Sequence, residues 1–179
     1  GEFLFQVGGI EIEGFNWAGQ DFQYPWEDCP RRHHRQRMTM KPFHIDRHPV
    51  TNAQFKRFID ASGYWPKDDQ NFLADWKEGA PRAGWDNKPV TWVSLEDARA
   101  YAQWAGKRLP HEWEWQYAAQ GNDGRLYPWG NDPQSGYLPR VNRGRRLLPP
   151  CEVDAHPQSA SPFGVEDLVG NVWQWTDEY

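Results

Sequence analysis

Hydrophobic and polar residues alternate at the start of the chain. Phe3 and Phe5 stand at alternate positions, and further apolar residues continue the alternation across residues 1–14, which is the pattern of a half-buried β-strand. Alternation returns in residues 38–45, while residues 15–37 show no regular pattern. The sequence therefore predicts strand-like structure in residues 1–14 and 38–45, with irregular structure between them.

Three later stretches carry the start and stop signals of helices. Thr51 and Gln54 form a capping box, in which each side chain binds the other residue's backbone N–H. Phe55 and Phe58 follow on one helical face, and Gly63 supplies the glycine that commonly ends a helix. These signals predict a helix between Thr51 and Gly63.

Two further helices are predicted from the same kind of signal. Ser94 can cap the first of them, which ends at Gly106, and the second begins after Pro110 and ends at Gly121. From residue 122 onward, turns and prolines predict no further helix. Strands followed by short helices and then by loops indicate an α+β fold class with much irregular structure.

Aromatic residues change the expected composition of the core. The chain has 179 residues, enough for one domain, and 38% of them are hydrophobic, with 12 Trp, 9 Phe and 7 Tyr. Large aromatic side chains can supply core volume where aliphatic residues are few. Disordered segments are poor in aromatics, so the composition predicts a folded chain.

The net charge bears on the kind of binding partner, and the cysteines bear on disulfide formation. The formal net charge is -5, and the basic run in residues 140–146 is therefore interpreted as a solvated loop, not a nucleic-acid surface. We expect neither a nucleic-acid partner nor a membrane-spanning segment. Cys29 and Cys151 form no CxxC motif, and both a disulfide and two free thiols stay open. The compartment is open as well, with the cytoplasm slightly favoured over secretion.

Four segments, taken in order, carry a family resemblance. They are residues 43–55, residues 89–119, the Tyr-Pro-Trp-Gly-Asn motif of residues 127–131, and residues 163–175, which end in Gly-Asn-Val-Trp-Gln-Trp. Together they resemble the formylglycine-generating enzyme (sulfatase-modifying factor) family across about residues 20–179. The resemblance implies a loop-rich variant of the C-type-lectin-like fold.

The resemblance also implies an activity. Formylglycine-generating enzymes carry out oxygen-dependent oxidation of a substrate cysteine with a pair of copper-binding cysteines, which follow the Gly-Asn-Val-Trp motif. We expect residues 1–179 to form a single such domain that lacks its C-terminal part, with the catalytic cysteine segment outside it. No catalytic residue is therefore assigned, and Cys29 and Cys151 receive no catalytic role.

Two alternatives stay open on the same fold. One is the C-terminal domain of a non-haem iron sulfoxide synthase of the ergothioneine type, and the other is a non-catalytic binding module. The family's iron ligands lie in a separate H-x3-H-x-E helical domain. Here His44 and His48 have the x3 spacing, but Val50 replaces the acid and Pro49 disfavours a helix at His48.

The remaining candidate residues are given structural interpretations. His33 and His34 diverge in any regular element, and His111 is expected to cap or pack, since Trp115 breaks an HExxH motif. The Trp113-x-Trp115 and Trp173-x-Trp175 pairs are interpreted as core in preference to a ligand surface. The substrate is expected to be a protein or a thiol-containing small molecule. Copper or iron is expected as a cofactor only if other segments supply its ligands.

A structural calcium ion is the cofactor that the resemblance implies within this chain. The family positions correspond to the side chains of Asp167 and Gln174 and to the backbone carbonyls of Gly170 and Val172. Calcium accepts carboxylate, amide and carbonyl oxygens. In the alternative interpretation, Asp167 and Gln174 only tie the loop by hydrogen bonds. A second family site would begin at Asn142, where a later acidic ligand has no clear counterpart.

Overall fold

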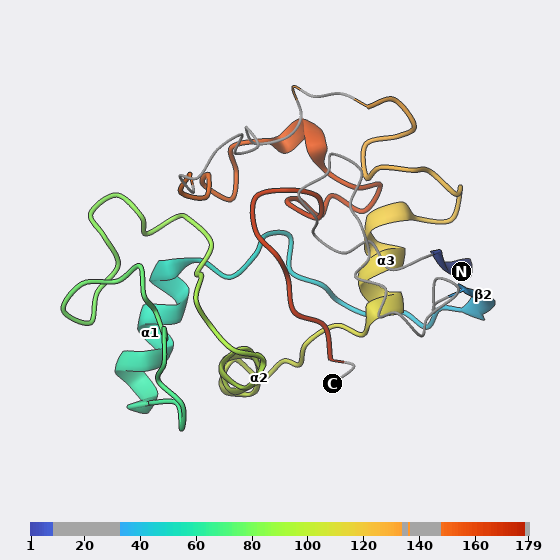
Figure 1. The fold of residues 1–179 in the computed structure, drawn as a ribbon. Coiled ribbons are helices and arrows are strands. Elements are labelled where there is room, and N and C mark those ends of the chain that lie inside the picture. The colour runs from blue at the N-terminus through green and yellow to red at the C-terminus, as the bar shows by residue number, and fades with distance from the viewer. Residues whose placement is uncertain (9–32, 134–135, 137–147, 178–179) are drawn as a thin grey trace, which may run out of the picture. The chain divides into compact units, whose positions relative to one another are not determined.

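The computed structural model describes residues 1–8, 33–133, 136 and 148–177. The chain divides into two compact units, Gly1–Pro42 and Phe43–Tyr179, and each is described by itself (Figure 1). Within the described residues, no helix is long and apolar enough to cross a membrane. The residues that the structure describes contain two strands, three α-helices and a 3₁₀ helix of three residues, which is a mixed α+β arrangement with few regular elements.

The first unit contains an antiparallel strand pair. Strand β1 (Glu2–Gly8) pairs with β2 (His33–Thr39), and Phe3 lies opposite Met38. Phe3 and Phe5 are buried, as their alternation predicts. The prediction of β1 is confirmed over residues 2–8, whereas residues 9–14 lie outside the described residues.

The position of the second strand corrects the sequence-based expectation. Residues 33–37, expected to be irregular, belong to β2, and residues 40–45 are not a strand. The run His33–Thr39 is nearly all polar and so lacks the alternation that marks a half-buried strand. Pairing with β1 forms the strand instead, and Pro42 has no N–H to extend the ladder.

Helix α1 (Asn52–Ser62) opens the second unit with the predicted capping box. Thr51 Oγ1 accepts from Gln54 N at 3.2 Å, and Gln54 Oε1 accepts from Thr51 N at 2.8 Å. The helix ends at Gly63, whose φ of 64° lies in the left-handed region that a side chain disfavours. The prediction of this helix is confirmed at both ends.

Helices α2 (Leu95–Trp104) and α3 (Glu112–Gln120) are confirmed as well. The Ser94 hydroxyl caps α2 by accepting from Asp97 N, and Asp97 Oδ2 accepts from Ser94 N at 2.7 Å. His111 is the N-cap residue of α3, and Gly121 follows its last turn. A single turn of 3₁₀ helix, η2 (Pro157–Ser159), was not expected from the sequence.

Aromatic rings form the interface between α1 and α2. Phe55 stacks on Tyr101 with centroids 5.6 Å apart, and Phe58 meets Tyr101 edge-on at 5.7 Å. Phe58 also contacts Trp104. Phe55 and Phe58 are almost fully buried, which bears out the expectation of a core rich in large aromatics.

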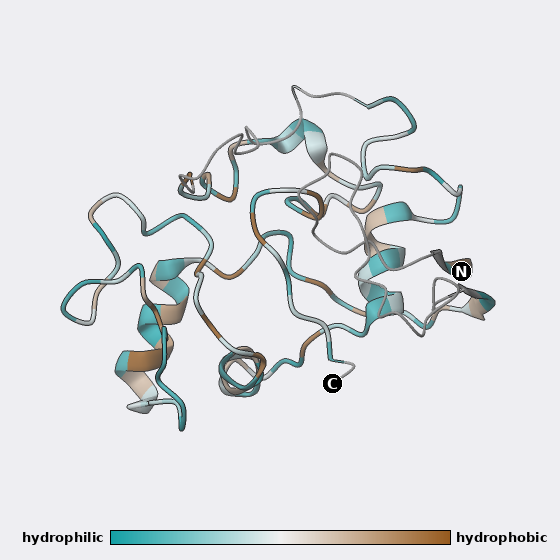
Figure 2. Cartoon of the chain, in the orientation of Figure 1, coloured by the Kyte–Doolittle hydropathy of each residue, from teal (hydrophilic) through white to brown (hydrophobic). Residues whose placement is uncertain are grey.

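A smaller aliphatic cluster lies under α3. Ala118 and Ala119 of the helix pack with Val165 and Leu168 of the C-terminal segment, and Ile45 packs against this cluster. Figure 2 shows the hydrophobic residues of this unit as short patches on the helices and on the chain that runs between them. Residues of the long loops thus contribute to the hydrophobic core, as expected for irregular segments that are packed against the domain.

Candidate functional site

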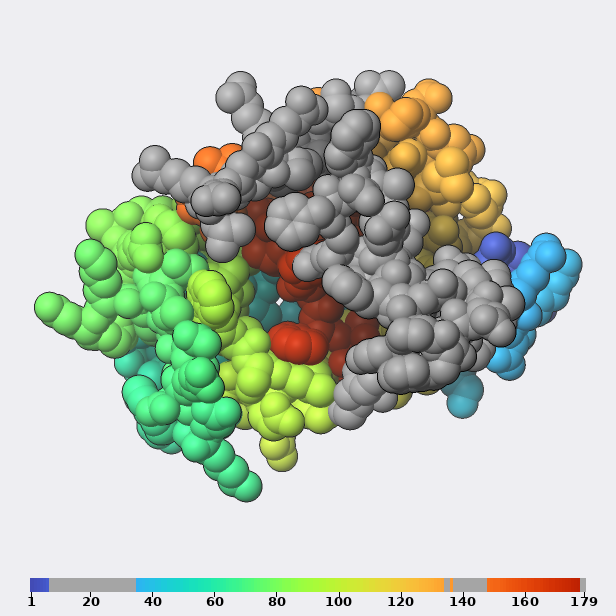
Figure 3. Space-filling view, viewed as in Figure 1, coloured from blue at the N-terminus to red at the C-terminus, as the bar shows by residue number. Residues whose placement is uncertain are grey.

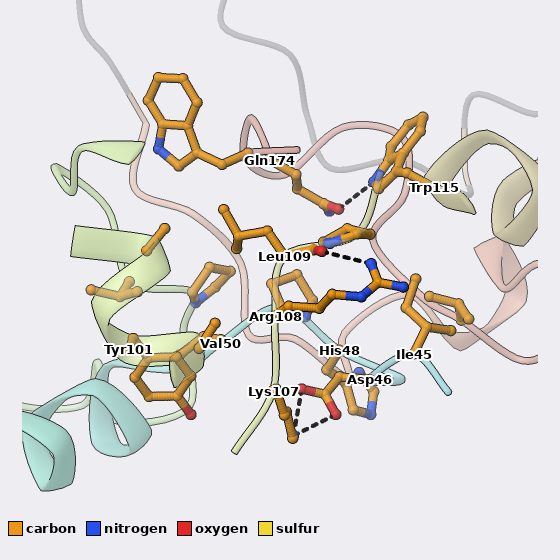
Figure 4. A pocket seen from close by; sticks show the side chains of 18 of the residues that line it. Ile45, Asp46, His48, Val50, Tyr101, Lys107, Arg108, Leu109, Trp115 and Gln174 are labelled. Carbon is orange, nitrogen blue, oxygen red and sulfur yellow. Dashed lines mark hydrogen bonds and ion pairs between the residues drawn. The ribbon is translucent and has the colours of Figure 1, made fainter. Parts of the chain in front are cut away.

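A pocket of about 510 Å³ lies in the second unit, between α2, α3 and the C-terminal segment. Figure 4 shows its labelled side chains coming from residues 45–50, from α2, from residues 107–109, from α3 and from the C-terminal segment. Its apolar wall contains Ile45, Val50, Val90, Val93, Leu109 and Leu168. The volume falls in the range of small-molecule sites.

Glu166 forms the buried acidic part of the pocket wall. Glu166 is only 2% exposed. Arg47 donates to Glu166 Oε1 through Nη2 at 2.6 Å and through Nε at 3.0 Å. The other oxygen, Oε2, is buried without a hydrogen-bond partner and lies 3.8 Å from His48 Nδ1, which is buried and unpartnered as well. Two polar atoms therefore face each other at the pocket without a bond between them.

Two ion pairs border the pocket near the α2–α3 connection. Arg108 donates to both carboxylate oxygens of Glu114 at 2.6 Å each, and the backbone N–H of His111 donates to Glu114 Oε2. The Arg108 hydrogen bonds hold the pKa of Glu114 below its usual value. Lys107 Nζ donates to both oxygens of Asp46 at 2.7 and 2.8 Å. These pairs fix the connection beside the pocket.

The loop at residues 166–174 brings together two of the predicted calcium ligands. Gln174 Nε2 donates to the backbone oxygen of Asp167 at 2.6 Å, and Gln174 Oε1 accepts from Trp115 Nε1 at 2.7 Å. Asn171 Nδ2 donates to Asp167 Oδ2 at 3.1 Å. Burial raises the pKa of the Asp167 carboxyl. Asp167 and Asn171 have φ of 57° and 60°, a conformation that Asp and Asn tolerate better than other side chains.

These contacts fit a calcium ion in part. The carboxylate of Asp167 is a type of oxygen ligand that calcium accepts. The Gln174 side-chain oxygen, however, is bonded to the Trp115 indole, and the Gly170 carbonyl accepts from Val172 N at 2.8 Å. These hydrogen bonds agree with the alternative interpretation, in which Asp167 and Gln174 stabilise the loop by hydrogen bonds without an ion. The calcium site therefore stays a prediction.

The other metal interpretations find no support in the described residues. No group of three or more His, Cys, Asp or Glu side chains could hold a metal ion within them. Cys151 is a partly exposed free thiol, and Asn171 Oδ1 accepts from its backbone N–H. His44, which is exposed, and His48, which is half-buried, both line the pocket. A cuprous site needs two close thiolates, so the described residues do not fit copper.

The structure confirms the interpretation of His111 and contradicts that of the Trp173-x-Trp175 pair. The N-cap position of His111, stacked on Trp113 with ring centroids 4.4 Å apart, confirms its structural role. Trp113 and Trp115 lie on a helix, so they do not share a face. The core interpretation is wrong for Trp173 and Trp175, which are 88% and 48% exposed. Their segment is not paired into a sheet within the described residues, so no common buried face arises.

The space-filling view agrees with this exposure. Figure 3 shows part of the C-terminal segment, in red, at the surface beside the yellow-green residues around α2. Trp175 Nε1 nevertheless donates to Val93 O at 3.0 Å, and Asp177 N donates to Pro110 O. The segment is thus held in place while its indole rings face solvent.

Several candidates lie outside the described residues. They are Cys29, Asn142 and the basic run at residues 140–146. His33 and His34 begin β2, and nothing further is said of their side chains. Glu166 and its contact with His48 were missed by sequence reasoning. The only signal was a pair of acidic residues, Glu166 and Asp167, between the apolar residues Val165 and Leu168.

Comparison with known proteins identifies the relatives of this chain. Residues 11–179 match the family model described as the sulfatase-modifying factor enzyme 1-like domain. A formylglycine-generating enzyme of Mycobacterium tuberculosis is 32% identical over 192 residues, covering 78% of this chain and 64% of the relative. The inactive C-alpha-formylglycine-generating enzyme 2 of Bos taurus is 35% identical, covering 78% of this chain and 60% of the relative.

A second activity is represented among the relatives. The hercynine oxygenase of Mycobacterium tuberculosis is 37% identical over 160 residues, covering 75% of this chain and 37% of the relative. The chain therefore spans less than two thirds of the length of each of these three relatives. An identity of about one third is thus shared with a relative named formylglycine-generating enzyme, with one named inactive and with one named hercynine oxygenase.

Proposed function

The chain belongs to the sulfatase-modifying factor enzyme 1-like family, and we propose that it forms part of a formylglycine-generating-type oxidoreductase. The observation that carries the proposal is the family match over residues 11–179 together with relatives named formylglycine-generating enzyme. Such an enzyme uses molecular oxygen to oxidise a cysteine side chain of a protein substrate. We further propose the C-type-lectin-like fold, which is supported by the short helices and hydrogen-bonded loops of the second unit.

The reactive groups of this proposed enzyme come from outside the described residues. Cys151 is the free thiol that the described part offers, and a second thiolate close to it is needed for copper. Copper chemistry therefore enters through ligands that other segments supply. The described residues contribute the pocket, its apolar wall and its paired charges.

A second candidate is part of a hercynine-oxygenase-type iron enzyme. The observation that favours it is the 37% identity to a hercynine oxygenase over 160 residues. On this proposal a thiol-containing small molecule replaces the protein cysteine. On this proposal the iron ligands would come from a separate helical domain, as the resemblance to the sulfoxide synthases implies.

Calcium is proposed as a structural cofactor of the 166–174 loop. The buried carboxylate of Asp167 would supply charge, and carbonyl oxygens of Gly170 and Val172 would complete the site together with the Gln174 amide. Support comes from the burial of Asp167, which is 2% exposed and stands in the same loop as the proposed carbonyl ligands. The Gln174 side-chain oxygen accepts from Trp115 Nε1 and would offer its second lone pair to the ion.

Oxygen uptake separates the two enzymatic candidates. The full-length gene product, loaded with copper and given a thiol reductant, is mixed with a Cys-x-Pro-x-Arg peptide in an oxygen electrode. Uptake above that with the matched Ser-x-Pro-x-Arg peptide is expected. The control peptide accounts for copper-catalysed oxidation of the reductant.

The same electrode tests the alternatives. Uptake with the iron-loaded protein, hercynine and a thiol donor, and none with the cysteine peptide, would replace the first candidate by the second. No substrate-dependent uptake under either condition would leave a non-catalytic binding module and overturn both.

A further inference from the structure

The turn after α3 contains a chemically labile pair of residues. Asp123–Gly124 is the single Asp-Gly pair in the 179 residues, and the sequence has no Asn-Gly pair. In an Asp-Gly pair the backbone nitrogen of the glycine can attack the side-chain carboxyl carbon of the aspartate, because no Cβ crowds that nitrogen. The five-membered succinimide that forms can reopen to isoaspartate, in which the main chain runs through the side-chain carbon. The sequence therefore marks one position for this modification.

The conformation of Asp123 favours this attack. Its Oδ1 accepts from the backbone nitrogen of Arg125 at 3.3 Å, so the side chain folds over the Gly124 peptide that lies between them. Gly124 has a φ of 72°, and a Cβ at this position would meet no atom within 4 Å. The Asp123 side chain is 53% exposed. The carboxyl group and the Gly124 peptide are thus neighbours in a turn that is open to water.

Arg125 binds the same carboxylate through its guanidinium group. Its Nη2 donates to Asp123 Oδ2 at 2.6 Å, and its Nε donates to Oδ1 at 2.9 Å. Two such bonds restrict rotation of the carboxylate. The Arg125 hydrogen bonds also lower the pKa of Asp123 to about 2. Succinimide formation needs the neutral carboxyl group, which loses its OH, so the bonds to Arg125 oppose the reaction.

We propose that Asp123 is the site of isoaspartate formation in this protein and that Arg125 controls its rate. The Gly124 nitrogen forms a bond to Asp123 Cγ, and the carboxyl OH leaves with the amide proton as water. One water molecule then cleaves the bond between the main-chain carbonyl carbon of Asp123 and the Gly124 nitrogen. The chain stays connected through Cγ, and no oxidant or reductant is consumed. This inference is independent of which reaction the protein performs.

The modification would loosen the connection that follows α3. Isoaspartate adds one methylene group to the main chain directly before Gly124. Arg125 O accepts from Gln120 Nε2 of α3 at 3.1 Å, and Arg125 Nη1 donates to Pro128 O at 2.9 Å. A longer main chain displaces Arg125 and weakens both bonds. Arg125 therefore fastens the connection and, through Asp123, slows the reaction that would unfasten it.

Peptide mapping of the aged full-length gene product tests the proposal. The protein is incubated at mildly acidic pH, and electron-transfer dissociation distinguishes isoaspartate from aspartate at residue 123. Arg125→Gln is expected to raise the rate at least about tenfold, because the neutral fraction of Asp123 rises when its pKa returns toward 3.8; this figure allows for solvent screening of the exposed pair. Arg82→Gln, which removes another exposed arginine paired with an aspartate, should leave the rate at residue 123 unchanged.

Two results would overturn the proposal. Equal rates in the parent and in Arg125→Gln would remove the role of Arg125. Isoaspartate that forms in Arg125→Gln no faster at residue 123 than at the exposed Asp154 would remove the site. Asp123→Glu should give no product at this position, because glutamate would need a six-membered ring. Thermal unfolding of each variant is compared with that of the parent, so that a misfolded variant is recognised.

Salt gives a second measurement without any substitution. An exposed ion pair weakens in about 1 M sodium chloride, so the parent should form isoaspartate at residue 123 faster there than at low salt. A synthetic peptide of residues 120–128, incubated in the same buffers, shows how salt acts on the reaction without the fold. An acceleration of the parent no larger than that of the peptide would contradict the control by Arg125 even if the variants failed to fold.

Discussion

Glu114 is the pocket carboxylate with the most fully defined partners. Arg108 donates to both of its oxygens and His111 N donates to one. The Arg108 bonds lower the pKa of Glu114 from its usual 4.5. A carboxyl with a lowered folded pKa stabilises the fold above its unfolded pKa, and this stabilisation is lost as pH falls through the folded pKa.

Glu114→Gln should therefore lower the free energy of unfolding at pH 7 and flatten its dependence on pH below about 4.5. The expected loss is about 1 kcal/mol, discounted because the Arg108 side chain is 55% exposed. Urea unfolding at several pH values measures it. Glu152→Gln, at an exposed position, serves as control, and an equal pH slope in both variants would count against the prediction.

Asp167 supports a prediction about calcium. If the loop binds the ion, calcium in hundredfold excess over its Kd should add about 2.7 kcal/mol to the free energy of unfolding. Asp167→Asn should remove that effect, whereas Asp132→Asn, at an exposed position, should keep it. Thermal unfolding with calcium or with a chelator measures the difference. Equal stability in both conditions would favour the loop tied by hydrogen bonds alone.

Local patterns predicted some site residues and missed others. Asp167 and Gln174 were predicted as neighbours, and the Gln174 amide does contact the Asp167 backbone. His48 was paired with His44 because of their spacing, but it faces Glu166, which is 118 residues away in sequence. Spacing along the chain cannot reveal such a contact, because it depends on how the C-terminal segment packs on residues 45–50.

The helices were predictable because their ends carry local chemistry. The Thr51–Gln54 and Ser94–Asp97 boxes act within one turn, so the sequence alone specifies them. Strand β2 was not predictable in this way, because its seven residues acquire their conformation from pairing with β1. Local signals thus locate caps well and strand partners poorly.

Asn52 joins α1 to the aromatic loop that follows it. Its Nδ2 lies within hydrogen-bonding distance of the backbone oxygens of Trp85, Lys88 and Pro89, and its Oδ1 accepts from Trp76 Nε1 at 2.7 Å. The residue is 2% exposed. One buried amide therefore holds the N-terminus of α1 and the loop together.

Asn52→Ala should lower the free energy of unfolding by roughly 3 kcal/mol, because several buried polar groups lose their partner at once. Chemical denaturation measures the change. Asn122→Ala, at an exposed position, is the matched control and should change stability by less than about 0.5 kcal/mol. A similar small change at Asn52 would show that the amide does not hold the loop.

For the molecule as a whole, the sequence identifies the protein family more firmly than it identifies the reaction. Four ordered motifs were enough to predict the family, because they extend over most of the chain, and the match over residues 11–179 confirms it. The reaction was not predictable to the same degree. Relatives with similar identity are named formylglycine-generating enzyme, inactive C-alpha-formylglycine-generating enzyme 2 and hercynine oxygenase. The described residues contain one thiol, that of Cys151.

Mass spectrometry of the substrate peptide tests the proposed reaction most directly. The copper-loaded full-length gene product should convert the cysteine of a Cys-x-Pro-x-Arg peptide to an aldehyde that an aminooxy reagent captures, provided that oxygen and a thiol reductant are present. A C–H bond and the C–S bond of the cysteine Cβ break, the carbon becomes the aldehyde, and the sulfur leaves as hydrogen sulfide. One oxygen atom of O2 enters the aldehyde and the other becomes water, with two electrons from the cysteine carbon and two from the thiol reductant, which becomes a disulfide. Recovery of unchanged cysteine peptide from copper-loaded, folded protein would contradict the assignment as a formylglycine-generating-type oxidoreductase.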